Sequence, residues 1–166
     1  PVRSVAVDAP SDPPYASEIA YLDALRPGDV VIADCSASTA AFWGELLTHA
    51  AIARGCRGAV IDGMVRDRAM IADLGFDLHA RGTHPTDSNG RMALVQMDVP
   101  LEIRGVLVAP GDLVVADGDG VVVVPAALVD EAVERAHAKS QLESEARALL
   151  AQGLLLADVY ARLGVL

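Results

Sequence analysis

The first half of the chain alternates between short apolar runs and helical patterns. Runs of β-branched and other apolar residues predict three strands, at Arg3–Val7, Val30–Asp34 and Ala59–Asp62. Apolar residues at helical spacing predict three helices, at Ser17–Leu25, Ala40–Arg54 and Asp67–Leu74. We expect Gly63 to make a turn after the third strand. This alternation of strand and helix is typical of βαβ units and favours a parallel sheet.

The second half changes character, because short apolar runs are separated there by Gly, Pro and Asp. The stretch VPLEIRGVLVAPGDLVVADGDGVVVVP predicts strands joined in hairpins. Its DGDG segment is interpreted as a tight turn, since a calcium loop would need a correctly spaced Glu and flanking helices. Pro125 then opens the C-terminal helices, at about 126–163, with a break at Gly153. We expect residues 1–166 to form a single domain.

Composition narrows the possible partners. The chain is 52% hydrophobic but only 4% aromatic, so Ala, Val and Leu must build its core. The formal net charge of -10 argues against nucleic acid or an anionic membrane as a partner, although one local Arg can still bind a small anion. No apolar run reaches the roughly 18 residues that a membrane helix needs. The two cysteines have no disulfide or metal-site spacing, which favours a cytoplasmic setting.

Charged residues follow the ends of the predicted strands. Arg66 and Asp67 come just after one strand, and Glu45, separated from Arg66 by twenty residues, follows another. One interpretation is structural: Asp67 caps a helix and pairs with Arg66 at the surface, which stabilises little. The other is functional, because ligands of open α/β sheets bind beyond the carboxyl ends of the strands.

The functional interpretation is a combined site for a divalent metal and an anion. Mg²⁺ prefers oxygen ligands and often takes only one or two carboxylates, here Asp67 and Glu45. Arg66 can bind a carboxylate bidentately. Backbone N–H groups of Leu46 and Leu47, at a helix start, can hold further anionic oxygens.

Other candidates are weaker. His84 lies in a polar loop that could close over a pocket, and Cys35 is interpreted as a buried thiol near the site. The chain contains no GxSxG motif, P-loop or GxGxxG fingerprint, so nucleotide binding is unsupported.

Three blocks of sequence resemble the RraA-like family. They are WGELLTHAAIARGCRGAVIDGMVRD, GFDLHARGTHPTDSNGR and PGDLVVADGDGVVVVP, and the resemblance runs from about Arg26 to the C-terminus. The family includes 4-hydroxy-4-methyl-2-oxoglutarate aldolases, which are also oxaloacetate decarboxylases. The resemblance implies a layered α/β/β/α, swivelling-domain-like fold, assembled as a homotrimer or homohexamer. We expect the numbered chain to lack the further N-terminal helical segment that family members carry.

The resemblance also assigns roles to the candidate residues. The aldolases carry an acidic residue, twenty intervening residues and then Arg-Asp. Asp67 would bind Mg²⁺ or Mn²⁺ directly, and Glu45 would contact the metal through water and help proton transfer. Arg66 would hold the pyruvyl group of a small 2-oxo acid, and the amides of Leu46 and Leu47 its carboxylate. The products would include pyruvate.

Two departures from the aldolase pattern concern the same region. Glu45 stands where the aldolases usually have the shorter Asp, and Met70 stands where they have an acidic residue. In the aldolases, an acid from a neighbouring subunit's C-terminal helix completes the site; Glu143 or Glu145 could take that part.

The family also offers an alternative function. Its regulator branch inhibits RNase E by binding it, and the archetype of that branch lacks the Asp of the Arg-Asp pair. The present chain retains Asp67, which favours the lyase.

The polar loop from Gly82 to Arg91 is a candidate for substrate selection. Side chains of Thr83, Asp87, Ser88 and Arg91 could face the far end of a bound acid.

Overall fold

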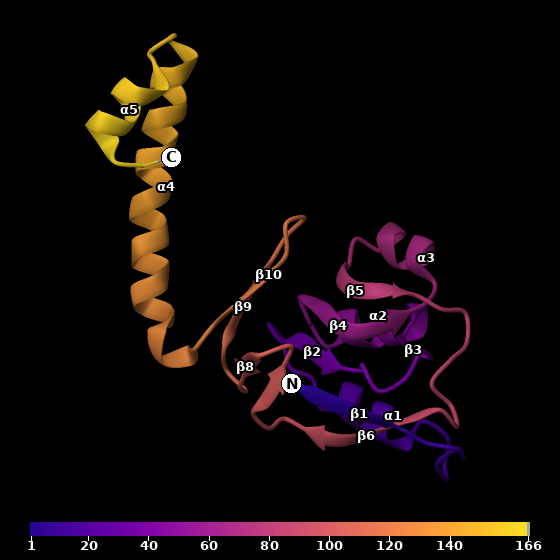
Figure 1. Ribbon diagram of the computed structural model, residues 1–166. Helices are drawn as coiled ribbons and strands as arrows, with labels where there is room; N and C mark the ends of the chain where they lie inside the picture. The colour runs from indigo at the N-terminus through magenta and orange to yellow at the C-terminus, as the bar shows by residue number, and fades with distance from the viewer. Residues whose placement is uncertain (166) are drawn as a thin grey trace. The chain divides into compact units, whose positions relative to one another are not determined.

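The computed structural model describes residues 1–165 and divides into two compact units, Pro1–Val123 and a second unit that begins at Val124. The strands are β1 (Val2–Ala6), β2 (Val30–Asp34), β3 (Ala41–Trp43), β4 (Gly58–Val65), β5 (Asp77–Thr83), β6 (Met92–Met97), β7 (Leu101–Ile103), β8 (Val106–Val108), β9 (Leu113–Ala116) and β10 (Val121–Val124) (Figure 1). The helices of the first unit are α1 (Ala16–Asp23), α2 (Glu45–Ala53) and α3 (Arg68–Asp73).

Six of the strands form one sheet in the order β3-β4-β2-β1-β6, with β5 also paired to β4. All neighbours are parallel except β6, which runs antiparallel to β1. The predicted parallel sheet is therefore confirmed. β2 and β4 are in register from Val30 opposite Gly58 to Asp34 opposite Asp62, so their carboxyl ends lie side by side.

One face of this sheet carries the core of the first unit. Inward side chains of the strands, such as Val31 and Ile61, pack in one cluster with Leu22 of α1, Ala51 of α2 and Ile71 of α3. All five of these side chains are at most 3% exposed. The burial of apolar surface on this face holds the three helices and, through them, fixes the loops at the carboxyl ends of the strands.

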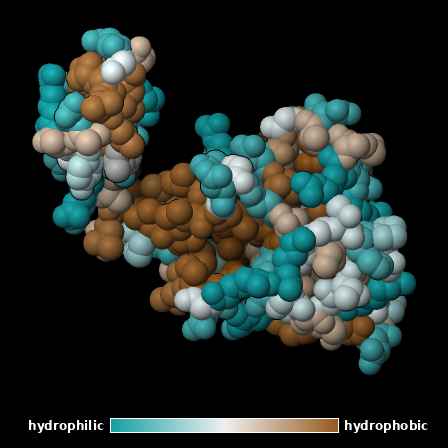
Figure 2. Space-filling model, turned by 45° about the horizontal axis from the view of Figure 1, so that its top comes forward, coloured by the Kyte–Doolittle hydropathy of each residue, from teal (hydrophilic) through white to brown (hydrophobic). Residues whose placement is uncertain are grey.

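The later strands form hairpins, as the Gly- and Pro-punctuated sequence predicts. β7 pairs antiparallel with β8, and β9 pairs with β10 across the DGDG turn, where the Asp117 carboxylate accepts the backbone N–H of Asp119 at 2.8 Å. Apolar side chains gather on the surface near these strands (Figure 2). Leu107 and Val122 are 66% and 60% exposed, respectively.

The second unit is helical, as predicted. A short 3₁₀ turn, η1 (Ala126–Leu128), leads into α4 (Val129–Ala151), and α5 (Leu156–Leu163) packs back against α4. The apolar contact between them includes the buried residues Ala146 and Val159. Among residues 1–165, no helix is both long enough and apolar enough to cross a membrane.

The predicted helix Ala40–Arg54 is wrong in its first turn. Residues 41–43 form β3, and α2 begins at Glu45. Phe42 and Trp43 fit the apolar face of a helix by spacing, but both are buried and β3 pairs with the end of β4 instead. Pairing with β4 thus overrides the local helical pattern.

The predicted turn at Gly63 is also wrong, because β4 continues through it to Val65. Gly63 is needed for a different reason. A Cβ at this position would lie 2.6 Å from the Cβ of Cys35, on the loop after β2. Cys35 is fully buried, as the sequence predicts for a thiol in this position, and burial raises its pKa to about 12.

We expect Gly63→Ala to destabilise the first unit by about 1–3 kcal/mol, because the added methyl overpacks the buried contact of Gly63 with the Cβ and backbone of Cys35. The control is Gly118→Ala, where a Cβ meets nothing within 4 Å. Urea unfolding followed by the fluorescence of Trp43, the single tryptophan, measures both variants. Equal midpoints for the two would contradict the packing argument.

Candidate functional site

Two strand-to-helix junctions meet at the carboxyl edge of the sheet. β3 leads through Gly44 into α2, and β4 leads through Arg66 and Asp67 into α3. The backbone N–H of Arg66 donates to the carbonyl of Trp43 at 2.8 Å, which extends the pairing of the two strands by one bond. Residues separated by more than twenty positions are therefore brought together by strand pairing.

The Asp67 carboxylate caps the neighbouring helix rather than its own. Asp67 is the N-cap residue of α3, but its side chain makes no cap hydrogen bond there. Instead, its Oδ2 accepts the backbone N–H of Glu45 at 3.2 Å, at the first residue of α2. The N-terminus of a helix has unpaired N–H groups and a partial positive charge, so a carboxylate is stabilised there.

Arg66 completes the charged group. Its Nε lies 3.7 Å from Asp67 Oδ2, and the two side chains are 42% and 33% exposed. An ion pair this long and this exposed contributes little to stability. The structural interpretation had Asp67 cap α3 and pair with Arg66 at the surface. The structure weakens both parts, because the Asp67 side chain makes no cap bond to α3 and its ion pair with Arg66 is long.

The contact between the two junctions requires glycine at position 44. A Cβ on Gly44 would lie 2.8 Å from Asp67 Oδ2 and 3.1 Å from Arg66 Nε. Behind it, the Trp43 indole donates to the hydroxyl of Thr48 at 2.8 Å, and that hydroxyl donates to the Gly44 carbonyl at 3.1 Å. The buried side chains of Trp43 and Thr48 thus fix the backbone at Gly44, against which Arg66 and Asp67 pack.

Glu45 points toward its own helix. Its Oε1 lies 3.1 Å from Nε2 of His49, one turn along α2, and its side chain is 21% exposed. The amides of Leu46 and Leu47 belong to the first turn of α2, where a helix offers no internal acceptors. The structure therefore brings Arg66 and Asp67 to the start of α2, where the Glu45 amide contacts Asp67, while the Glu45 carboxylate is directed along α2 toward His49.

The polar loop between β5 and β6 borders the same edge. The His84 N–H donates to the carbonyl of Val65 at 3.0 Å, and the Ala41 N–H donates to the carbonyl of Thr86 at 2.8 Å. Within the loop, Ser88 is 5% exposed and so contributes to packing. Its neighbour Asp87 is 32% exposed at the side chain.

Sequence reasoning missed Tyr15. It precedes α1 in a left-handed conformation, with φ 60°, and its hydroxyl donates to Asp87 Oδ2. The hydrogen bond to Asp87 raises the pKa of the Tyr15 phenol, and the positive charge of Arg66 partly opposes this rise. No local pattern marks such a residue, because its partner is 72 positions away.

A second charged group lies on the other face of the sheet. Asp62 of β4 is 12% exposed and its Oδ1 is approached by Arg104 Nε at 2.8 Å and Arg81 Nε at 3.5 Å. Beside it, Asp34 accepts from Arg3 Nε at 2.9 Å. Burial alone would raise the pKa of Asp34, but hydrogen bonds from Ser36 and Arg3 outweigh it and lower the pKa. These pairs link β1, β2, β4, β5 and the β7–β8 turn.

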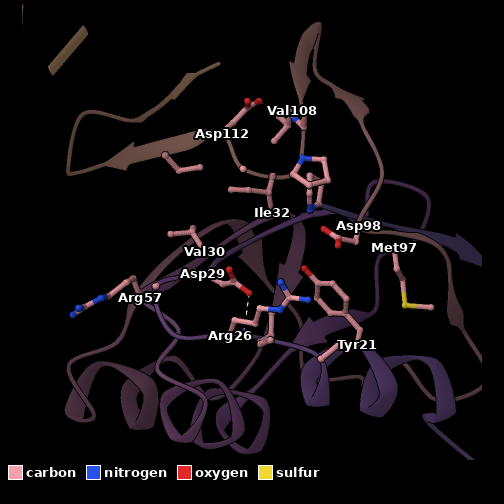
Figure 3. A pocket seen from close by; sticks show the side chains of 18 of the residues that line it. Tyr21, Arg26, Asp29, Val30, Ile32, Arg57, Met97, Asp98, Val108 and Asp112 are labelled. Carbon is pink, nitrogen blue, oxygen red and sulfur yellow. Dashed lines mark hydrogen bonds between the residues drawn. The ribbon is translucent and has the colours of Figure 1, made fainter. Parts of the chain in front are cut away.

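A cavity of ≈ 920 Å³ lies at the opposite end of the strands from Asp67. Its wall includes Tyr21, Asp29, Val30, Met97 and Asp98, which Figure 3 shows around the opening. Val30 is the first residue of β2, so the cavity is at the amino end of the sheet. It is distinct from the predicted site.

The candidate acids from the C-terminal helix are paired within the second unit. Glu143 lies 3.5 Å from Lys139 Nζ, and Glu145 lies 3.2 Å from Arg162 Nη2. These surface pairs are weak, so they leave either carboxylate available to another group.

Comparison with known proteins identifies the family. The model of the RraA-like family, described as Aldolase/RraA, matches residues 5–123. A protein of Halalkalibacterium halodurans, named as a candidate 4-hydroxy-4-methyl-2-oxoglutarate aldolase, is 33% identical over 151 residues, which cover 89% of this chain and 68% of that protein. A similarly named protein of Albidiferax ferrireducens is 39% identical over 105 residues, covering 63% of this chain and 60% of that protein. Legionella pneumophila DlpA is 30% identical, and the match covers 80% of this chain but only 22% of DlpA.

Solved structures agree with the sequence comparisons. An uncharacterized protein of Pseudomonas syringae superposes with a TM-score of 0.81 at 33% identity, covering 95% of this chain and 76% of that one. Streptomyces coelicolor RraAS2, described as an unusual member of the RNase ES inhibitor RraA family, superposes with a TM-score of 0.75 at 32% identity, covering 88% and 72%. The α/β fold expected from the family resemblance is confirmed, and the chain belongs to the RraA-like family.

Proposed function

We propose that the protein is a divalent-metal-dependent lyase that cleaves a carbon–carbon bond of a 2-oxo acid to give pyruvate. The reaction is a retro-aldol cleavage of the 4-hydroxy-4-methyl-2-oxoglutarate type, a decarboxylation of oxaloacetate, or both. The supporting observation is the hydrogen bond from the Glu45 N–H to the Asp67 carboxylate, which joins the two halves of the motif. The names of several relatives as candidate aldolases point the same way.

The donor set fits Mg²⁺ or Mn²⁺. Only one oxygen of Asp67 is engaged by Glu45, and the side chain is 33% exposed, so the other oxygen is available to an ion. Residues 1–165 contain no group of three or more His, Cys, Asp and Glu side chains that could hold a metal. An ion at Asp67 would therefore take one direct carboxylate and fill its other positions with water and substrate oxygens. When bound, the metal would polarise the 2-oxo group.

The surrounding residues would bind the substrate and manage its charge. Arg66 would hold the pyruvyl end and stabilise the enolate that forms when the C3–C4 bond breaks. The first-turn amides of Leu46 and Leu47 would bind the substrate carboxylate. Glu45 would hold a water that carries a proton to C3.

We further propose a homotrimeric or homohexameric assembly in the cytoplasm. Exposed apolar side chains on the hairpins, including Leu107 and Val122, provide surface for contacts between copies. An acid from a neighbouring copy, Glu143 or Glu145, would then complete the site.

Asp67→Ala tests the lyase. We expect the loss of at least about 100-fold in kcat/KM for pyruvate release from oxaloacetate with Mg²⁺, because metal-assisted stabilisation of the enolate amounts to several kcal/mol. The control is Asp73→Ala, which removes an exposed carboxylate from the other end of α3. Both proteins are assayed with and without Mg²⁺. Equal rates of pyruvate release from Asp67→Ala and the parent would exclude the proposed mechanism.

The alternative is a non-catalytic regulator that binds and inhibits RNase E. Its support is the structural likeness to RraAS2, from a family described as RNase ES inhibitors. Recovery of purified RNase E by the immobilised protein, together with no metal-dependent pyruvate release, would establish this alternative over the lyase.

The backbone at Asp67 provides a second test. Asp67 has φ 60° and ψ 29°, a left-handed conformation that costs most residues about 1–2 kcal/mol and costs glycine almost nothing. We expect Asp67→Gly to be about 1 kcal/mol more stable than Asp67→Ala in urea unfolding, since both lose the same carboxylate. An alanine variant as stable as the glycine variant would show that the backbone relaxes and carries no strain. A glycine variant more stable than the alanine variant would support the view that the chain keeps Asp67 for its carboxylate, at a cost in stability.

A further inference from the structure

The cavity at the amino end of the main sheet has apolar walls from two parts of the first unit. Val30 and Ile32 of β2 line it from the sheet, and Val108 of β8 and Leu113 of β9 line it from the later strands. Its volume of ≈ 920 Å³ falls within the range of about 300–1,000 Å³ that ligand pockets span. The interior therefore suits the hydrocarbon part of a small molecule.

Tyr21 of α1 places a polar group in this cavity. Its ring belongs to the hydrophobic core and the residue is only 8% exposed, whereas its hydroxyl points into the opening (Figure 3). Among residues 1–165, this hydroxyl has no hydrogen-bond partner. A buried tyrosine hydroxyl usually has one, and its absence costs stability. The Tyr21 hydroxyl is therefore available to a ligand.

Charged groups of both signs line the same opening. Figure 3 shows the Arg26 guanidinium and the Asp98 carboxylate beside the Tyr21 hydroxyl. The backbone N–H of Arg26 donates to Asp29 Oδ2 at 2.8 Å, but its guanidinium forms no ion pair in the part of the chain that the structure describes. Asp98 acts on the Pro1 amine without forming an ion pair with it. A cation and an anion thus face the cavity without ion-pair partners.

The protonation of these groups defines what they can bind. Burial foremost raises the pKa of Tyr21, and the charges of Asp29 and Asp98 raise it further. The hydroxyl therefore stays protonated and can donate to an anionic group, as can the guanidinium of Arg26. The Asp98 carboxylate offers only acceptor oxygens. Together these side chains provide donors for a carboxylate and an acceptor for an ammonium group.

We propose that this cavity is a binding site for a free α-amino acid with a large apolar side chain. Arg26 and the Tyr21 hydroxyl hold its carboxylate, Asp98 holds its ammonium group, and the apolar walls cover its side chain. A zwitterion matches unpaired groups of both signs, whereas a ligand with one charge leaves the opposite group without a partner. The site is at the other end of the strands from Asp67, so the inference does not depend on the proposed lyase.

Calorimetry with related ligands tests the match of charges. L-Phenylalanine carries both charges, 3-phenylpropanoate lacks the ammonium group, and 2-phenylethylamine lacks the carboxylate. We expect phenylalanine to bind the parent at least about tenfold more tightly than either analogue, because each loses a hydrogen bond between charged groups. Glycine, which has no apolar side chain, should show no measurable binding, since it buries almost no apolar surface.

Two variants test which side chain holds which charge. Tyr21→Phe removes only the hydroxyl, and we expect it to weaken phenylalanine and 3-phenylpropanoate by about tenfold and to leave 2-phenylethylamine unchanged. Asp98→Asn should weaken phenylalanine and 2-phenylethylamine by about tenfold and leave 3-phenylpropanoate unchanged. The control is Tyr160→Phe, which removes the hydroxyl of an exposed tyrosine in α5 and should bind all three ligands as the parent does.

Three results would overturn the inference. The first is the absence of any phenylalanine binding to the parent at millimolar concentration. The second is equal affinity of the parent for phenylalanine and both analogues, which would indicate adventitious apolar contact only. The third is a loss in Tyr21→Phe that is as large for 2-phenylethylamine as for 3-phenylpropanoate, because a purely structural effect does not distinguish the charge of the ligand.

Discussion

The hydrogen bond from the Glu45 amide to the Asp67 carboxylate is the contact on which the candidate site depends. It joins the start of α2 to the residue just after β4, and it exists only because β3 lies beside the end of β4. The amide has no acceptor in its own helix, and the carboxylate has no role in capping α3. The Glu45 amide and the Asp67 carboxylate therefore supply each other's hydrogen-bond partner, and the charge of Asp67 lies at the positive end of the α2 dipole.

Two features of the backbone accompany this contact. Gly44 has no side chain where a Cβ would meet Asp67 at 2.8 Å, and Asp67 itself adopts a left-handed conformation. Neither feature adds packing to the hydrophobic core, because the Asp67 side chain that both of them accommodate is exposed. The Asp67 carboxylate thus projects from a left-handed backbone position into space that the adjacent junction leaves free at Gly44. Tyr15 also has a left-handed backbone, and its hydroxyl donates to Asp87.

The sequence predicts this site as far as regular patterns extend. Strand and helix periodicity place Arg66 and Asp67 just after a strand, and the βαβ rule brings that strand end near the helix that carries Glu45. Periodicity could not predict β3, because its three residues also fit a helical face and only pairing with β4 decides between the two. Tyr15 was out of reach for a related reason, since its conformation and its partner are set by the tertiary fold. The role of Gly63 also depends on a neighbour, Cys35, that lies on another strand's loop.

The two departures from the aldolase pattern have different structural consequences. The carboxylate of Glu45 reaches His49 one turn further along α2, and this pairing directs it along its own helix rather than across to the other junction. Met70 is 54% exposed, so it replaces an acidic residue without serving the core. With a methionine in that place, the start of α3 carries less negative charge around Asp67. A divalent ion bound by Asp67 would consequently draw more of its ligands from water and from the substrate, and its binding would be coupled more strongly to that of the substrate.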